Sequence, residues 1–197
     1  MISAKHNPIS SLLACAASTF SSHKSQMGVD ASEALLQACT QPLVKTSHTV
    51  DQCKQLPKAY KQQDSLLNRE IEKLETTLHW NDTGAAAKGD NIQQHLAFVE
   101  LLGPTGMTLN DHCRVGLFFQ NAHAEYPMHR HAAQELYFVI SGTALWKQSD
   151  SDFTPKPTGS FIHHASWKPH GTTTISEPML AMWCWTGDVG FDTYEII

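Results

Sequence analysis

Apolar residues follow a helical period in the first part of the chain. Between residues 64 and 80, Leu67, Ile71, Leu74 and Leu78 fall on one stripe of a helix. The charged residues of this segment fall on other faces and are expected to face solvent: Arg69, Glu70, Glu72, Lys73 and Glu75. The pattern predicts a helix over residues 64–80 that buries one face.

A second helix is predicted near residues 31–39, because Asp30 stands three residues before Glu33, as in a capping box. Near the N-terminus, Leu12-Leu13-Ala14-Cys15 resembles the cleavage box of a bacterial lipoprotein. Polar residues interrupt the apolar run before it, which a secretory leader does not tolerate well. We therefore expect a short N-terminal helix, with a processed leader as the open alternative.

The pattern changes after residues 81–91, whose glycine and polar residues predict a loop. From Leu96 onward, short runs rich in Val, Phe, Trp and Tyr alternate with Gly and Pro, as in antiparallel strands. The predicted strands cover residues 96–102, 113–119, 136–140, 143–147, 171–175 and 179–185. We expect residues 1–90 to form a helical region that packs on a β-domain of residues 91–197. Periodicity alone does not separate a sandwich from a closed barrel.

Composition narrows the class of protein. A hydrophobic content of 41% and a charged content of 17% are typical of a soluble globular chain, and 197 residues suffice for one domain. The net charge of -5 without a Lys/Arg cluster argues against nucleic acid or anionic membranes as partners, and no segment reaches the ~20 apolar residues of a membrane span. Five cysteines without Cys-x-x-Cys spacing indicate reduced thiols and a cytoplasmic location. These features favour a small-molecule substrate.

The candidate chemistry lies in residues 126–142. His129 and His131 are two residues apart in an extended segment, so both imidazoles point to the same side of a sheet. Glu135 and Tyr137 share their odd parity, so four polar side chains converge if the chain stays extended. Two imidazole nitrogens and a carboxylate oxygen suit zinc, iron, manganese or nickel and leave positions for water or substrate. The segment predicts one catalytic divalent metal ion per chain; the alternative is a chance cluster in a chain that has 12 histidines.

This spacing resembles the first motif of the cupin superfamily, His-x-His, three residues, Glu, six residues, and a glycine, here Gly142. Gly159 and His170 match the second cupin motif. Ala165-Ser166-Trp167 replaces the Pro-x-Gly turn of that motif, and Thr174 replaces its asparagine. The resemblance implies a mainly β fold, the double-stranded β-helix or jelly-roll barrel, with His170 as a further metal ligand.

Two other histidines compete with His170 for the ligand role. His163 and His164 do not have the motif's distance from Gly159, so we expect them to be satisfied structural histidines or histidines at the rim. We expect Trp167, in the replaced turn, to be a packing residue.

Residues 126–197 are similar to the dimethylsulfoniopropionate (DMSP) lyases of the DddL/DddQ type. The similarity rests on the run His-Arg-His-Ala-Ala-Gln-Glu-Leu-Tyr-Phe-Val, on residues 163–170 and on the Trp-rich last predicted strand. These enzymes carry a helical part before the cupin barrel. The resemblance implies a metal-dependent carbon–sulfur lyase that splits DMSP into acrylate and dimethyl sulfide by β-elimination.

The resemblance also implies roles for single residues. His131, Glu135 and His170 match metal ligands, and His129 matches a fourth. Tyr137 lies at the position of a tyrosine that is a ligand or the base. We expect it to be the base, because a nearby divalent ion favours the phenolate. The alternative is an ordinary strand aromatic with a structural hydrogen bond.

Three aromatic residues are candidates for substrate binding. Tyr126 matches a second tyrosine of the family's active site, with a catalytic or binding role. Trp183 and Trp185, with Tyr126, could present aromatic faces to the sulfonium group. The alternative is that the tryptophans belong to the core, and they share a face only if the last strand is regular.

Other functions and assemblies stay open at this point. One alternative is a different cupin metalloenzyme, such as a dioxygenase or an isomerase, and another is a non-catalytic cupin that binds a small ligand. A homodimer paired through barrel strands is the preferred assembly, and a helical region that covers this edge is the alternative.

Overall fold

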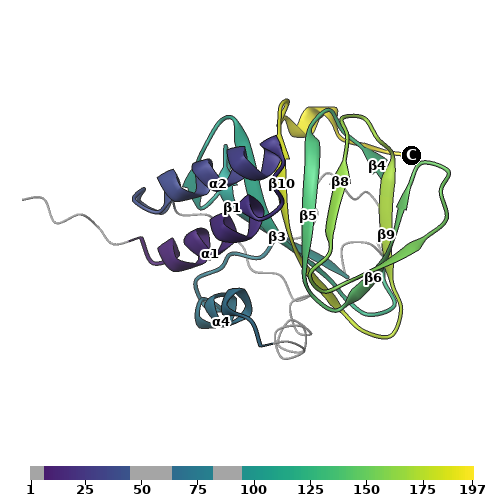
Figure 1. Ribbon diagram of the computed structural model, residues 1–197, viewed down its shortest axis with the longest axis horizontal. Helices are drawn as coiled ribbons and strands as arrows, with labels where there is room; N and C mark the ends of the chain where they lie inside the picture. The colour runs from purple at the N-terminus through teal and green to yellow at the C-terminus, as the bar shows by residue number, and fades with distance from the viewer. Residues whose placement is uncertain (1–6, 45–63, 82–94) are drawn as a thin grey trace, which may run out of the picture.

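The computed structural model of the protein describes residues 7–44, 64–81 and 95–197. Figure 1 shows helices α1, α2 and α4 gathered on one side of a β-barrel, with β4, β6 and β9 on the side away from them. In these ranges no helix is long and apolar enough to cross a membrane. The four cysteines that they contain are free thiols: Cys15, Cys39, Cys113 and Cys184.

Helix α1 (Ser10–Ser21) confirms the short N-terminal helix. Leu12, Leu13, Ala16 and Phe20 recur at helical spacing and are fully buried. The segment that resembles a lipoprotein cleavage box therefore belongs to a helix packed in the core.

Helix α2 (Gln26–Ala38) begins earlier than predicted. Ser25 is its N-cap residue, and the Ser25 hydroxyl accepts a hydrogen bond of 3.1 Å from the backbone N–H of Gly28. Asp30 is an exposed residue inside the helix, so the capping role predicted for it is wrong. The apolar stripe extends back to Met27, which explains why the helix starts five residues earlier.

Helix α4 (Leu66–Lys73) is shorter than the predicted range of 64–80. It begins after the N-cap Ser65, and residues 74–77 continue as turns. The predicted stripe of Leu67, Ile71, Leu74 and Leu78 is buried, as expected.

Glu70 of α4 is also buried, so its predicted position facing solvent is wrong. The Glu70 carboxylate accepts a hydrogen bond of 2.6 Å from Lys73 Nζ, one turn away. Because α4 packs against α1, its buried face is wider than a single stripe.

Two facing sheets form the β-domain. The first has the strand order β2 (Thr108–Leu109), β1 (Leu96–Gly103), β3 (Cys113–Gln120), β10 (Met179–Thr186), β5 (Gln134–Ser141), β8 (Phe161–His164). The second has the order β11 (Glu195–Ile196), β4 (Glu125–Arg130), β9 (His170–Thr174), β6 (Thr143–Gln148), β7 (Thr154–Pro157). All pairs are antiparallel except β1 with β2.

This arrangement is the cupin jelly-roll barrel preceded by helices, as the resemblance implied. All six predicted strands are present, with shifts of one or two residues at their ends. Of the strands that were not predicted, β2 and β11 have only two residues each and β7 contains two prolines. Such segments have too weak a period to stand out in the sequence. The predicted loop at residues 81–91 lies outside the described residues except for Asn81, which pairs with Phe98.

Strand β10 separates two hydrophobic cores. Leu180, Met182 and Cys184 point outward to the core shared with the helices. The residues at the alternate positions of β10, which include Trp183 and Trp185, point into the barrel. The candidate metal-binding residues lie in this interior.

Candidate metal centre

Four side chains converge in the barrel at one end of the two sheets: His129, His131, Glu135 and His170. Their potential ligand atoms all lie within 4.8 Å of one another, and each residue is at most 2% exposed. His129 lies on β4, His131 follows it, Glu135 lies on β5 and His170 opens β9. The cluster predicted from the sequence is brought together, and it could hold a metal ion.

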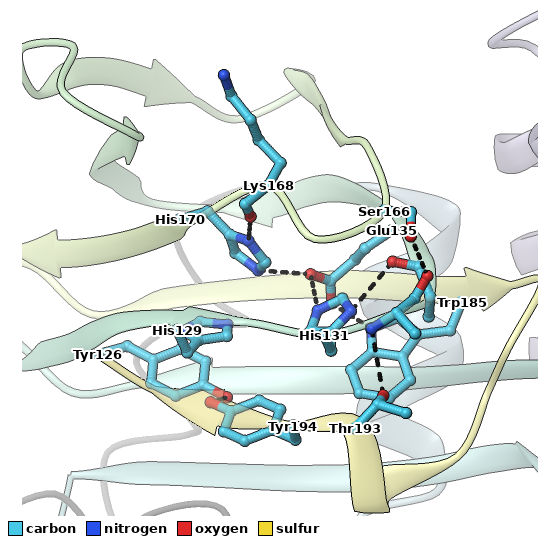
Figure 2. Close-up of polar contacts among 12 residues, drawn as sticks. Tyr126, His129, His131, Glu135, Ser166, Lys168, His170, Trp185, Thr193 and Tyr194 are labelled. Atoms are coloured by element: carbon cyan, nitrogen blue, oxygen red, sulfur yellow. Dashed lines mark hydrogen bonds and ion pairs between the residues drawn. The ribbon is translucent and has the colours of Figure 1, made fainter.

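Each of the three imidazoles is oriented by a backbone carbonyl. The Nδ1 atoms of His129, His131 and His170 lie 2.7, 3.1 and 2.7 Å from the carbonyl oxygens of Pro127, Ala133 and Lys168. Because a carbonyl only accepts, each Nδ1 carries a proton, which leaves Nε2 as the ring atom that could bind a metal ion. Figure 2 shows His170 Nε2 and a ring nitrogen of His131 turned toward the Glu135 carboxylate.

The two oxygens of Glu135 have different partners. Oε2 lies 3.3 Å from His131 Nε2 and 2.9 Å from His170 Nε2. Oε1 accepts a hydrogen bond of 2.7 Å from Trp185 Nε1. Burial disfavours the charged carboxylate, but hydrogen bonds and charge interactions with His131 and His170 outweigh it, so the pKa of Glu135 lies well below its usual range.

The donor atoms suit a divalent metal ion. Burial, reinforced by the charge of His170, holds the pKa of His129 well below its ordinary value of 6.5, so this ring is neutral. Three imidazole nitrogens and one ionised carboxylate form a set typical of catalytic sites for borderline metals. The carbonyl partners at Nδ1 are the usual second contacts of metal-binding histidines. The residues therefore fit the ion that the sequence predicts.

Tyr126 and Tyr194 pack against His129. Their rings stack on His129 with centroids 4.3 and 5.0 Å away, and their hydroxyls form a hydrogen bond of 2.7 Å (Figure 2). Burial raises the pKa of both phenols. Tyr194 was not predicted from the sequence; the pairing of β11 with β4, Ile196 opposite His129, brings it to the site.

Tyr137 lies inside the barrel, 3% exposed, two residues after Glu135. Its ring packs against Trp146 and His164, with centroids 4.7 and 5.9 Å away. Burial, reinforced by the charge of Glu135, raises the pKa of Tyr137 well above its ordinary value of 10. In the metal-free protein Tyr137 is therefore a neutral phenol.

Trp183 and Trp185 share the inner face of β10, with ring centroids 5.8 Å apart. Trp185 also packs on His131, at a centroid distance of 4.1 Å. With its hydrogen bond to Glu135, Trp185 contacts two of the candidate ligands. This supporting contact was not predicted from the sequence.

The two rival histidines have different environments. His163 is exposed, as expected of a rim residue. His164 is fully buried, and its ring lies parallel to that of His170 at 3.9 Å. Neither ring nitrogen of His164 has a hydrogen-bond partner among the described residues, so the expectation that it is satisfied or at the rim is wrong.

The turn that replaces the cupin Pro-x-Gly sequence, Ala165-Ser166-Trp167, contains a residue with a positive φ. Trp167 stands at the glycine position and has a φ of 59°, in the left-handed region. Its side chain is 46% exposed, so the packing role expected for it is wrong. The backbone N–H of Trp167 donates to the His131 carbonyl at 2.8 Å, and the Ser166 hydroxyl donates to the Ala132 carbonyl at 2.6 Å. Two hydrogen bonds thus connect the turn to the loop that carries His131.

Comparison with known proteins identifies a family that the sequence matches. The sequence matches the dimethylsulfoniopropionate lyase family over residues 23–181. It is 29% identical over 101 residues to the dimethylsulfoniopropionate lyase DddQ of Ruegeria pomeroyi. This match covers 51% of the chain and about half, 50%, of that relative.

Solved structures share the fold. The crystal structure of DddQ from Ruegeria pomeroyi DSS-3 superposes with a TM-score of 0.66 at 21% identity, covering 79% of this chain and 80% of that one. A chain from the crystal structures of the DMSP lyases RdDddP and RnDddQII reaches a TM-score of 0.74 at 19% identity, covering 96% and 97%. The similarity to the second structure includes the N-terminal helices as well as the barrel.

Proposed function

The chain belongs to the dimethylsulfoniopropionate lyase family, and on that premise we propose that it cleaves DMSP into acrylate and dimethyl sulfide. The observation that carries this proposal is the buried cluster of His129, His131, Glu135 and His170 beside Tyr137. We propose that this cluster holds one zinc, iron, manganese or nickel ion per chain.

A bound divalent ion would supply positive charge that stabilises a phenolate and the negative charge that develops next to the substrate carboxylate. The protein contributes the geometry of the site. The carbonyl contacts at Nδ1 and the bond from Trp185 to Glu135 hold the donor atoms in place before the reaction. Burial of the four residues excludes bulk water from the site.

Tyr137 is the proposed base. As a phenolate it removes the proton from the carbon next to the carboxylate. The electron pair of that C–H bond forms the C=C bond of acrylate, and the C–S bond breaks with its pair leaving on sulfur. The products are acrylate, neutral dimethyl sulfide and the protonated phenol of Tyr137, so charge and atoms balance.

The aromatic residues are proposed to bind the sulfonium group. Trp183, Trp185 and Tyr126 all line the barrel interior, and aromatic faces attract cations. The Tyr126 ring in addition stacks on His129, and its hydroxyl forms a hydrogen bond with that of Tyr194. We propose both a binding and a catalytic role for Tyr126, as the family resemblance implies.

Two further properties are proposed from the sequence. Free thiols at the four described cysteines support a cytoplasmic location. A homodimer paired through barrel strands remains a prediction, which the molar mass in solution tests.

The test of the function is a product analysis. Purified, metal-loaded protein is incubated with DMSP, and acrylate in solution and dimethyl sulfide in the headspace are both quantified. We expect the two products in equal amounts. Oxygen consumption without dimethyl sulfide would instead indicate a cupin dioxygenase.

A further inference from the structure

A group of buried polar side chains next to the metal centre has no partner for its polar atoms. Trp146, His164 and Thr172 are 4%, 0% and 2% exposed. Trp146 Nε1, both ring nitrogens of His164 and Thr172 Oγ1 have no hydrogen-bond partner among the described residues. Buried polar groups are normally paired, and each unpaired one lowers stability. Several such groups at one place point to a ligand.

Two of these residues, Trp146 and Thr172, lie in the row next to the proposed metal ligands. In the five-stranded sheet, Thr172 on β9 pairs with Trp146 on β6 and with Tyr126 on β4. The adjacent row of this sheet contains His170, which pairs with His129. Side chains at alternate positions of β9 point to the same face, so Thr172 and His170 both point into the barrel.

His164 reaches the same place from the opposite sheet. It pairs with Glu135 across β5 and β8, and its ring stacks on His170 at 3.9 Å with an angle of 9°. The Trp146 ring lies 5.9 Å from His164 and 4.7 Å from Tyr137. The group therefore spans the space between a proposed ligand and the proposed base.

The polar atoms of this group can donate three hydrogen bonds. An indole N–H only donates, a neutral imidazole has one donor, and a threonine hydroxyl has another. The complementary ligand is small and rich in acceptors, which is the chemistry of a carboxylate. A sulfonium group has no acceptor atoms, so it does not match these donors.

We propose that Trp146, His164 and Thr172 form a binding site for the carboxylate of the substrate. This inference rests on the proposed function, in which the metal centre stabilises the negative charge that develops next to the carboxylate. One carboxylate oxygen faces the metal centre, and the other receives hydrogen bonds from this group. The carbon that loses its proton is bonded to the carboxyl carbon, so the site places it beside Tyr137. The subsite selects carboxylates over neutral amides.

The test measures equilibrium binding of propionate and of propionamide to the metal-loaded protein by calorimetry. The variants are Trp146→Phe, which removes only the indole N–H donor, and Thr172→Val, which keeps the shape of the side chain. We expect the wild type to prefer propionate, and each variant to bind propionate roughly ten-fold more weakly at unchanged metal content. Binding of propionate as in the wild type by both variants would overturn the proposal.

Trp80→Phe is the matched control. Trp80 Nε1 is also buried without a partner among the described residues, but Trp80 belongs to the core between the helices and the six-stranded sheet. Its replacement should leave propionate binding unchanged, and a loss equal to that of Trp146→Phe would count against the subsite. Loss of metal from both Trp146→Phe and Thr172→Val would also overturn the proposal, because the residues would then support the metal centre and not the ligand.

The subsite and the lyase activity can fail separately. A wild type that releases no dimethyl sulfide, but whose propionate binding depends on Trp146 and Thr172, would refute the proposed reaction and keep the subsite. A wild type that cleaves DMSP, with variants that bind propionate normally, would keep the proposed reaction and refute the subsite.

Discussion

Trp185 donates a hydrogen bond of 2.7 Å from its indole Nε1 to Oε1 of Glu135. This bond fixes one oxygen of the carboxylate, so the other oxygen faces the Nε2 atoms of His131 and His170. The Trp185 ring also packs on His131. A residue that resembled a substrate-binding aromatic thus also positions the proposed metal ligands.

Replacing Trp185 by Phe removes this bond and keeps most of the ring packing. We expect the metal affinity to fall by about 10-fold to 100-fold, the usual effect of losing a second contact of a ligand. Competition with a metal-binding dye measures it. Trp183→Phe is the control, because the Trp183 indole makes only a long bond of 3.4 Å to the Leu117 carbonyl. Equal affinities for both variants would show that the Glu135 contact does not support the metal.

Replacing Tyr137 by Phe tests the base. Because burial and the Glu135 charge raise the pKa of Tyr137, the phenolate should form only when a divalent ion is present. Metal addition should produce a phenolate absorption band in the wild type and none in Tyr137→Phe. The variant should keep its metal and lose dimethyl sulfide release by at least about 100-fold, the low end of the contribution of a general base. Full activity would exclude Tyr137 as the base.

Trp167 offers a test of backbone strain. A non-glycine residue at a φ of 59° is strained by about 1 kcal/mol or more, and the half-exposed ring recovers little of this by packing. Trp167→Gly should therefore raise the free energy of unfolding by about 1 kcal/mol, measured by urea denaturation. Trp167→Ala keeps the strain and should show no gain. A loss of stability in the glycine variant would mean that the indole packs more strongly than its exposure suggests.

The metal-free protein should lose stability on mild acidification. Burial, reinforced by the charge of His170, lowers the pKa of His164 well below its ordinary value of 6.5, and His129 behaves in the same way. Below pH 6.5 the unfolded chain therefore binds protons that the folded chain does not, so the free energy of unfolding falls as the pH falls. Each such histidine contributes a slope of up to about 1.4 kcal/mol per pH unit.

His164→Asn removes one of these groups and should reduce the slope, measured by urea denaturation at a series of pH values in the presence of a chelator. The same substitution at the exposed His163 is the control. An unchanged slope in His164→Asn would mean that His164 takes up its proton in the folded state.

The cluster of candidate metal ligands was predictable because it depends on local geometry. His129 and His131 lie two residues apart in one extended segment, so their sides follow from the strand period alone. His170 was found through its distance from Gly159, and only β8 and the turn after it separate the two residues. The buried stripe that contains Leu67 and Ile71 was predictable for the same reason, because helical spacing is a local pattern.

The errors concern contacts between distant parts of the chain. Tyr194 reaches His129 only because β11 pairs with β4, and two residues of strand carry no recognisable period. The burial of Glu70 depends on how α4 packs on α1. The stacking of His164 on His170 depends on the two sheets facing each other, which strand periodicity does not encode.

We propose that the cluster of His129, His131, Glu135 and His170 holds a metal ion that DMSP cleavage requires. The most direct measurement is dimethyl sulfide release from DMSP by the wild type before chelation, after chelation and after metal is added back. We predict activity that disappears with the metal and returns with it, and none in His131→Ala under any of these conditions. Undiminished release from protein shown to be metal-free would contradict the claim.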